Sequence, residues 1–208
     1  MEHIIVMGNV ATGKSHLTKV LQYNLHHKIV LYPEFINDDA FAMEMLRRRF
    51  AGTVSALTFQ NFIMDKWVEN KKLNEGKEGI CMYERLPDDA VKVFAKLSLS
   101  VPEYAIQKQR LKDLEMLSYK DMNKDNCTWI RYENNFTKDL TPLIETVNSM
   151  KTKYVVIEVR SETAFNNYLH RNRREEFYTK DEIEQLQKLY NSFAERQLIE
   201  IGCELIEL

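Results

Sequence analysis

The sequence predicts an α/β fold built on a parallel sheet, and three observations support this prediction. Short apolar runs rich in isoleucine and valine recur along the chain, separated by longer stretches with helical spacing. Such alternation is typical of βαβ units, in which helices cover both faces of the sheet. A glycine-rich loop directly follows the first apolar run and opens a helix. No linker or repeat divides the 208 residues, so we expect one domain over 1–208.

The apolar runs predict five strands, at 3–7, 28–32, 79–83, 154–159 and 203–207. Helices are predicted between them, at about 14–26, 38–50, 54–72, 88–98, 102–121, 138–150, 162–173 and 180–198. The stretch 107–136 is polar, and 121–126 within it has the composition of a loop. Residues 129–132 then fit a short strand or the start of a helix, and both alternatives stay open.

The composition argues against several classes of function. Lysine and arginine total 29 against 31 acidic residues, a net charge of −2, so a nucleic-acid polymer is not the expected partner. Cys81, Cys127 and Cys203 lack metal-binding spacing, and we expect reduced thiols. No apolar run reaches the roughly 18 to 20 residues that span a bilayer, and no signal peptide precedes the first strand. The expected protein is soluble and cytoplasmic, without a membrane partner.

The glycine-rich loop reads G-x-x-x-x-G-K-S, with the residues Gly8, Asn9, Val10, Ala11, Thr12, Gly13, Lys14 and Ser15. Between a strand and a helix, this pattern predicts a phosphate-binding loop. The glycines allow a tight turn whose backbone N–H groups face an anion, and the helix dipole adds positive charge. In such loops the lysine reaches the β- and γ-phosphates and the serine hydroxyl holds Mg²⁺. The chain is therefore predicted to bind a nucleoside triphosphate.

Charged residues follow the second and third predicted strands. Glu34 comes just after 28–32, and Glu84 and Arg85 come just after 79–83. Because the carboxyl ends of parallel strands line the ligand crevice, we expect these residues beside the loop. Glu34 could take a proton from a hydroxyl that attacks the γ-phosphate, although a solvated loop acid is the alternative. Glu84 stands where P-loop enzymes carry a Mg²⁺-directing acid.

Three other positions carry a functional and a plain interpretation. Gln60 lies in an apolar helix, where its amide could read a nucleobase or be partly exposed. Arg47, Arg48 and Arg49 are consecutive, so they cannot all lie on one face of a helix. Most of them are expected at the solvated surface, and one of them could face the crevice. Arg171 and Arg173 could converge on a transferring phosphoryl group, or form an exposed face of ion pairs.

Together these motifs resemble the deoxynucleoside kinase family, which includes deoxycytidine, deoxyguanosine and deoxyadenosine kinases. The matching motifs are the phosphate loop, Pro33-Glu34, Thr58-Phe59-Gln60, Glu84-Arg85, and Glu162-Thr163 with Arg171, Arg173, Glu175 and Glu176. The resemblance implies transfer of phosphate from ATP, with Mg²⁺, to the 5′-hydroxyl of a deoxyribonucleoside in nucleotide salvage. It also implies a P-loop NTPase fold with a five-stranded parallel sheet, an arginine-bearing lid at about 167–179, and a homodimer.

The resemblance further assigns roles to individual residues. Glu34 takes the proton of the 5′-hydroxyl, and Arg85 helps it. Ser15 and Glu84 hold Mg²⁺, and Gln60 binds the base. Arg171 and Arg173 clamp the phosphoryl group, and Glu176 contacts the sugar 3′-hydroxyl. A sugar-contacting tyrosine of the family falls near Arg49 and Phe50. Other positions differ, because a lid arginine is Asn167 and a base-contacting aspartate is Ala90. The chain ends just past the last strand, so a short or missing adenine-covering loop is expected.

Two other functions stay open. A nucleoside monophosphate kinase needs no general base, because its acceptor phosphate is already ionised, but it needs an extra cation such as Arg49. A non-catalytic P-loop protein would bind nucleotide as a switch, and Asn167 in the lid motivates this alternative. Assays of nucleosides against their monophosphates distinguish the three functions.

Overall fold

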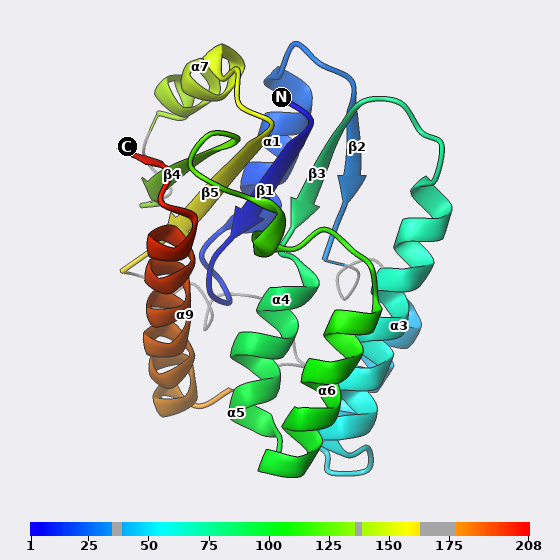
Figure 1. Ribbon diagram of the computed structural model, residues 1–208. Helices are drawn as coiled ribbons and strands as arrows, with labels where there is room; N and C mark the ends of the chain where they lie inside the picture. Colours follow the sequence, from blue (N-terminus) through cyan, green and yellow to red (C-terminus); the bar gives the residue numbers. More distant parts are fainter. Residues whose placement is uncertain (35–38, 136–138, 163–177) are drawn as a thin grey trace.

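The computed structural model describes residues 1–34, 39–135, 139–162 and 178–208. Within them, one parallel sheet has the strand order β2-β3-β1-β5-β4-β6 (Figure 1). The strands are β1 (His3–Met7), β2 (Ile29–Tyr32), β3 (Ile80–Glu84), β4 (Cys127–Glu133), β5 (Tyr154–Arg160) and β6 (Glu204–Glu207). The parallel α/β prediction is confirmed, and all five predicted strands are present. The prediction of five strands in the sheet is wrong, because the sheet has six.

The sixth strand is β4, which lies in the stretch that we left unassigned. Residues 129–132 therefore belong to a strand rather than to the start of a helix. β4 pairs in parallel with both β5 and β6, so that Trp129 lies opposite Val156 on one side and Leu205 on the other. The polar side chain at the centre of β4, Arg131, is accommodated because its Nε donates to Glu158 Oε2 at 3.1 Å. This charged residue interrupts the apolar run that would predict a strand.

The described helices follow the predicted order with two differences, and the predicted helix 162–173 lies outside the described residues beyond 162. They are α1 (Lys14–Asn24), α2 (Ala40–Phe50), α3 (Ala56–Asn74), α4 (Pro87–Asp89), the π-helix η1 (Ala90–Ala95), α5 (Lys96–Ser98), α6 (Val101–Asp113), the 3₁₀ turn η2 (Tyr119–Asp121), α7 (Thr141–Ser149) and α9 (Lys180–Ile201). The predicted helix 88–98 contains a π-helical segment, a feature that often marks functional sites. The predicted helix 102–121 ends early, because Glu115 has a φ of 46° that an α-helix cannot continue.

Both faces of the sheet are covered by helices, and successive residues of β1 point to opposite faces. Ile4 and Val6 belong to an apolar cluster with residues of α1 and α7. Ile5 and Met7 belong to a second cluster with residues of α3, η1 and α9. In Figure 1, α1 and α7 accordingly lie apart from α3, α4 and α9. Burial on both faces explains why the strands are near-continuous apolar runs.

In the part of the chain that the structure describes, no helix is long and apolar enough to cross a membrane.

Candidate active site

The phosphate-binding loop connects β1 to α1 at the carboxyl edge of the sheet. Its backbone turns through positive φ angles at Gly8 (149°), Ala11 (60°) and Gly13 (93°). A Cβ added to Gly8 would lie 2.4 Å from the carbonyl oxygen of Val159, so this position needs glycine. Alternation of right- and left-handed residues is the conformation that forms anion-binding concavities. Positive φ angles therefore occur at both glycines of the motif and at Ala11, and phosphate binding by this loop stays a prediction.

Contacts from two distant elements brace this loop. Asn9 Nδ2 donates to Gln187 Oε1 of α9 at 3.0 Å. Asn134, which follows β4, donates from Nδ2 to the carbonyl of Thr12 at 2.7 Å. The ammonium group of Lys14 is buried and donates to the carbonyl of Asn9 at 2.6 Å. A cation is thus held against the loop, where a bound phosphate would meet it.

Ser15 and Glu84 form the pair that we predicted to hold a metal. The hydroxyl of Ser15 donates to Glu84 Oε1 at 2.7 Å, so the first turn of α1 meets the end of β3. Burial raises the pKa of Glu84, and so does the charge of Glu34, whereas Lys14, Ser15 and Arg85 act in the opposite direction. A hydroxyl beside a carboxylate suits Mg²⁺, which prefers oxygen and completes its shell with phosphates and water. Among the described residues, no group of three or more His, Cys, Asp or Glu side chains that could hold a metal ion occurs.

Glu34 and Arg85 join the ends of β2 and β3 at the start of the loop. Arg85 Nη1 lies 2.5 Å from Glu34 Oε1. Its Nη2 and Nε also donate to the carbonyl of Gly8, at 3.3 and 3.4 Å. The guanidinium carbon lies 4.7 Å from the ring centroid of Phe94. The side chain of Arg85 is therefore held on three sides and aims the carboxylate of Glu34.

Two further properties mark Arg85 as an unusual residue. Its φ is 68°, a left-handed conformation that costs free energy for a residue other than glycine. Burial alone would lower its pKa, but Glu34 outweighs that effect together with Tyr190, Glu84 and Asp89, and the pKa is raised. Arg85 therefore stays charged although only 8% of it is exposed.

Gln60 lies on α3 among buried apolar residues and is 6% exposed. Within the described part of the chain, its Oε1 atom has no hydrogen-bond partner. A buried amide oxygen without a donor is costly, by about 1–3 kcal/mol, and such an atom needs an explanation. A bound nucleobase with an amino or imino donor would supply one.

Other predicted residues are less closely connected to the loop. Arg49 and Phe50 are half-buried at the end of α2, and the ring of Phe50 packs edge-on against Tyr178 at 5.1 Å. Arg47 is exposed and pairs with Glu44 at 2.5 Å, as expected for solvated surface. The lid residues, with those nearby, lie outside the described residues: Asn167, Arg171, Arg173, Arg174 and Glu176.

The sequence did not indicate a buried cluster behind Arg85. Asp89 is 0% exposed and accepts hydrogen bonds from the backbone N–H of Leu86 at 2.8 Å and from Tyr119 at 3.2 Å. The hydroxyl of Tyr190, on α9, also donates to Asp89. Asp89 lies at the start of the predicted helix 88–98, and its contact with the N–H of Leu86 suits that position. Nothing in the sequence pattern connects it to tyrosines so far along the chain.

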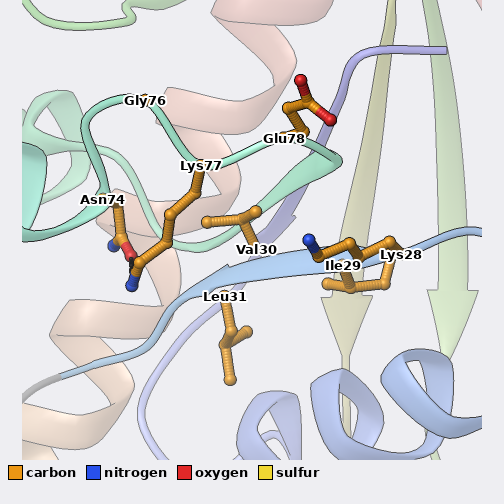
Figure 2. A pocket seen from close by; sticks show the side chains of 8 residues that line it. All are labelled: Lys28, Ile29, Val30, Leu31, Asn74, Gly76, Lys77 and Glu78. Carbon is orange, nitrogen blue, oxygen red and sulfur yellow. Dashed lines mark hydrogen bonds between the residues drawn. The ribbon is translucent and has the colours of Figure 1, made fainter.

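A separate hollow of about 480 Å³ lies at the edge strand β2 (Figure 2). It is lined by residues of β2 and of the turn that enters β3, namely Lys28, Ile29, Val30, Leu31, Asn74, Gly76, Lys77 and Glu78. None of the predicted site residues takes part. The chemistry of the chain is concentrated at the phosphate loop, so we place the candidate site there and not in this hollow.

Comparison with known proteins gives a likeness in fold. No protein-family model matches the sequence, and no curated protein does. Solved structures of a deoxyadenosine kinase from M. mycoides match nearly the whole chain. The structure with the products dCMP and a flexible dCDP bound gives a TM-score of 0.66 at 15% identity, over 99% of this chain and 89% of that chain.

Two more structures of that kinase agree. The one with bound dCTP gives a TM-score of 0.62 at 16% identity, over 99% of this chain and 89% of that chain. The one with bound dATP gives 0.59 at 14% identity, over 100% of this chain and 91% of that chain. At such low identity the likeness establishes the fold, and this chain has a deoxynucleoside kinase-like fold.

Proposed function

We propose that this chain is a deoxynucleoside kinase, which transfers the γ-phosphate of ATP to the 5′-hydroxyl of a deoxyribonucleoside. One observation carries the proposal: the Glu34 carboxylate, aimed by Arg85, stands beside a phosphate-binding loop. An alcohol acceptor must lose a proton as it attacks, and a positioned carboxylate can take it. The similar structures bind deoxynucleotides, which supports an acceptor of this class.

The proposed reaction depends on positioning and charge more than on covalent chemistry. The loop amides and Lys14 hold the donor phosphates. Ser15 and Glu84 would hold Mg²⁺, which supplies positive charge to the β- and γ-phosphates when bound. Glu34 accepts the proton of the 5′-hydroxyl, and Arg85 keeps the carboxylate pointed at that hydroxyl. Each of these groups lies at the same edge of the sheet.

In this proposal, further residues bind the deoxynucleoside acceptor. Gln60 hydrogen-bonds the base through its amide, whose oxygen has no partner among the described residues. Arg49 and Phe50 line the sugar side. Arg171 and Arg173 clamp the phosphoryl group and Glu176 binds the 3′-hydroxyl, as the family resemblance implies. The homodimer, the role in nucleotide salvage and the cytoplasmic location belong to the same proposal.

The test is an assay of the purified protein with Mg²⁺, radiolabelled ATP and the four deoxynucleosides beside their monophosphates. We expect labelled monophosphate from at least one nucleoside. Glu34→Ala should lower kcat by roughly 10²- to 10⁴-fold and leave ATP affinity, measured by calorimetry, nearly unchanged. Glu34→Gln is the matched control for shape, because it keeps an acceptor for Arg85 but cannot act as a base.

Three outcomes would contradict this proposal. Phosphorylation of monophosphates alone would identify a nucleoside monophosphate kinase, for which Arg49 is the candidate acceptor cation. Tight nucleotide binding without any product would identify a non-catalytic P-loop protein. Full activity of both Glu34 variants would remove the general-base role.

A further inference from the structure

The turn that follows Arg85 is held by a buried carboxylate, Asp89, which in turn accepts from a buried tyrosine. The hydroxyl of Tyr190 donates to Asp89 Oδ1. The other carboxylate oxygen, Oδ2, accepts from the backbone N–H of Leu86 at 2.8 Å. Leu86 directly follows Arg85, so Asp89 fixes the residue next to the strained one. The same turn is held on its other side, where the N–H of Arg85 donates to Val6 at 3.0 Å.

The ring of Tyr190 also reaches the surroundings of the Arg85 side chain. It packs edge-on against Phe94 at 6.2 Å, and Phe94 lies against the guanidinium of Arg85. Burial raises the pKa of the Tyr190 hydroxyl well above its ordinary value, so the hydroxyl stays protonated and donates to Asp89. Tyr190 thus contacts both Asp89 and the aromatic ring that packs against Arg85.

We propose that Tyr190 and Asp89 are a positioning pair, which fixes the turn at Arg85 and thereby aims the Arg85–Glu34 pair at the reacting oxygen. The proposal rests on the proposed function, because it assigns the pair to the acceptor half of that site. Neither residue needs to touch substrate. A displacement of about 1 Å in a reacting group can cost about 10²-fold in rate, so a small shift of this turn would be measurable.

Tyr119 offers a matched control within the same cluster. Its hydroxyl also donates to Asp89, at 3.2 Å, and it is as deeply buried as Tyr190. Its ring instead packs against Trp129 and Phe193, at 6.3 and 5.6 Å, in the core between the sheet and α9. Removing either hydroxyl takes one donor from one carboxylate. Oδ2, which Tyr119 contacts, still accepts from the N–H of Leu86 at 2.8 Å, whereas Tyr190 is the donor to Oδ1.

The experiment compares Tyr190→Phe with Tyr119→Phe in the whole protein. Both variants should show a similar fall in Tm. Tyr190→Phe should lower kcat about tenfold to hundredfold with the KM of both substrates changed less than about threefold, because aim is lost and binding is not. Tyr119→Phe should keep kcat within about twofold. Asp89→Asn keeps the shape of the carboxylate and should lower kcat to a similar extent as Tyr190→Phe. It replaces Tyr190→Phe in the experiment if that variant fails to fold.

A second measurement needs no substrate. In wild-type protein the Nε–H of Arg85 should exchange slowly with solvent by NMR, because it is buried and faces the carbonyl of Gly8 at 3.4 Å. Exchange should become at least about fivefold faster in Tyr190→Phe and stay unchanged in Tyr119→Phe. This exchange measurement tests the positioning pair separately from the proposed kinase function, because it is valid even if the wild type phosphorylates no nucleoside.

Either of two results would overturn the positioning pair. Equal losses of kcat in both tyrosine variants would mean that the cluster acts only through stability. Unchanged kcat and unchanged Arg85 exchange in Tyr190→Phe would mean that the turn holds its geometry without this pair.

Discussion

The two halves of the sheet on either side of β1 place their charged residues differently. In the β3–β2 half, Glu34, Glu84 and Arg85 lie at or just after the carboxyl ends of the strands, around the phosphate loop. In the β5–β4–β6 half, the charged residues lie within the strands. Glu158 of β5 accepts from Arg131 at 3.1 Å and from Arg160 at 2.6 Å.

These two arrangements have different consequences. The network in the β5–β4–β6 half closes on itself, since Glu195 of α9 accepts from Arg131 and Arg160 as well, at 2.6 and 2.9 Å. Its charges satisfy one another and hold α9 against the sheet. In the β3–β2 half, Arg85 has a strained backbone. Gln60, on α3, has a buried amide oxygen without a partner among the described residues. Strain and unsatisfied polar groups are typical of a site that serves a ligand, and paired charges are typical of one that serves the fold.

In the comparison of the two halves, the largest expected effect on activity comes from Arg85. We expect Arg85→Met to lower kcat by about 10²- to 10³-fold, because Glu34 loses the partner that aims it. Steady-state kinetics with ATP and the accepted nucleoside would measure the change. A higher KM for ATP with an unchanged kcat would instead place Arg85 in donor binding, and the contrast between the halves would not hold.

The equivalent change in the other half should affect stability. Arg131→Met leaves Glu158 with one fewer cation, although Arg160 still pairs with it, so we expect a loss of about 2 kcal/mol in the free energy of unfolding. The expected kcat is within about twofold of wild type. Urea unfolding and kinetics on the same preparation test both statements. A kcat loss comparable with that of Arg85→Met would show that both halves serve the reaction.

How far sequence reasoning reached depends on whether the deciding interactions are local. The strand 154–159 was predictable because parallel strands buried on both faces are continuous apolar runs. β4 was not, because Arg131 at its centre is compensated by Glu158, which is distant in sequence. The helix 102–121 was predicted too long, because its sequence pattern does not indicate the left-handed backbone conformation of Glu115.

The same distinction holds for the candidate site. Glu34 and Arg85 could be placed together in advance, because strand ends meet at one edge of a parallel sheet. Their direct contact is what the structure adds. Asn134 and Tyr190 could not be found, since Asn134 reaches the loop and Tyr190 reaches Asp89 from elements whose positions only the whole fold determines. Single polar residues of this kind carry no spacing signal.

The smallest expected effect is a difference in pH dependence between two acids. Burial raises the pKa of Glu84 in the folded protein above its ordinary value of 4.5. The folded state therefore binds a proton more tightly than the unfolded state, and stability falls as pH rises through the folded pKa. Glu84→Gln cannot ionise, so its Tm should be close to that of wild type near pH 4.5 and higher at neutral pH. The variant should lose activity as well, since it removes the proposed metal ligand.

Glu103 is the matched control, with the opposite sign. This partly exposed residue accepts from the hydroxyl and the N–H of Ser100, at 2.6 and 3.0 Å, and these bonds lower its pKa. Its contribution is present above the ordinary pKa and is lost as pH falls, so Glu103→Gln should lower Tm slightly at neutral pH and not in acid. Thermal unfolding of the three proteins between about pH 4 and pH 8 measures both signs. A Tm difference for Glu84→Gln that does not vary with pH would mean that burial does not raise the pKa of Glu84. Its assignment to a buried metal pair would then need revision.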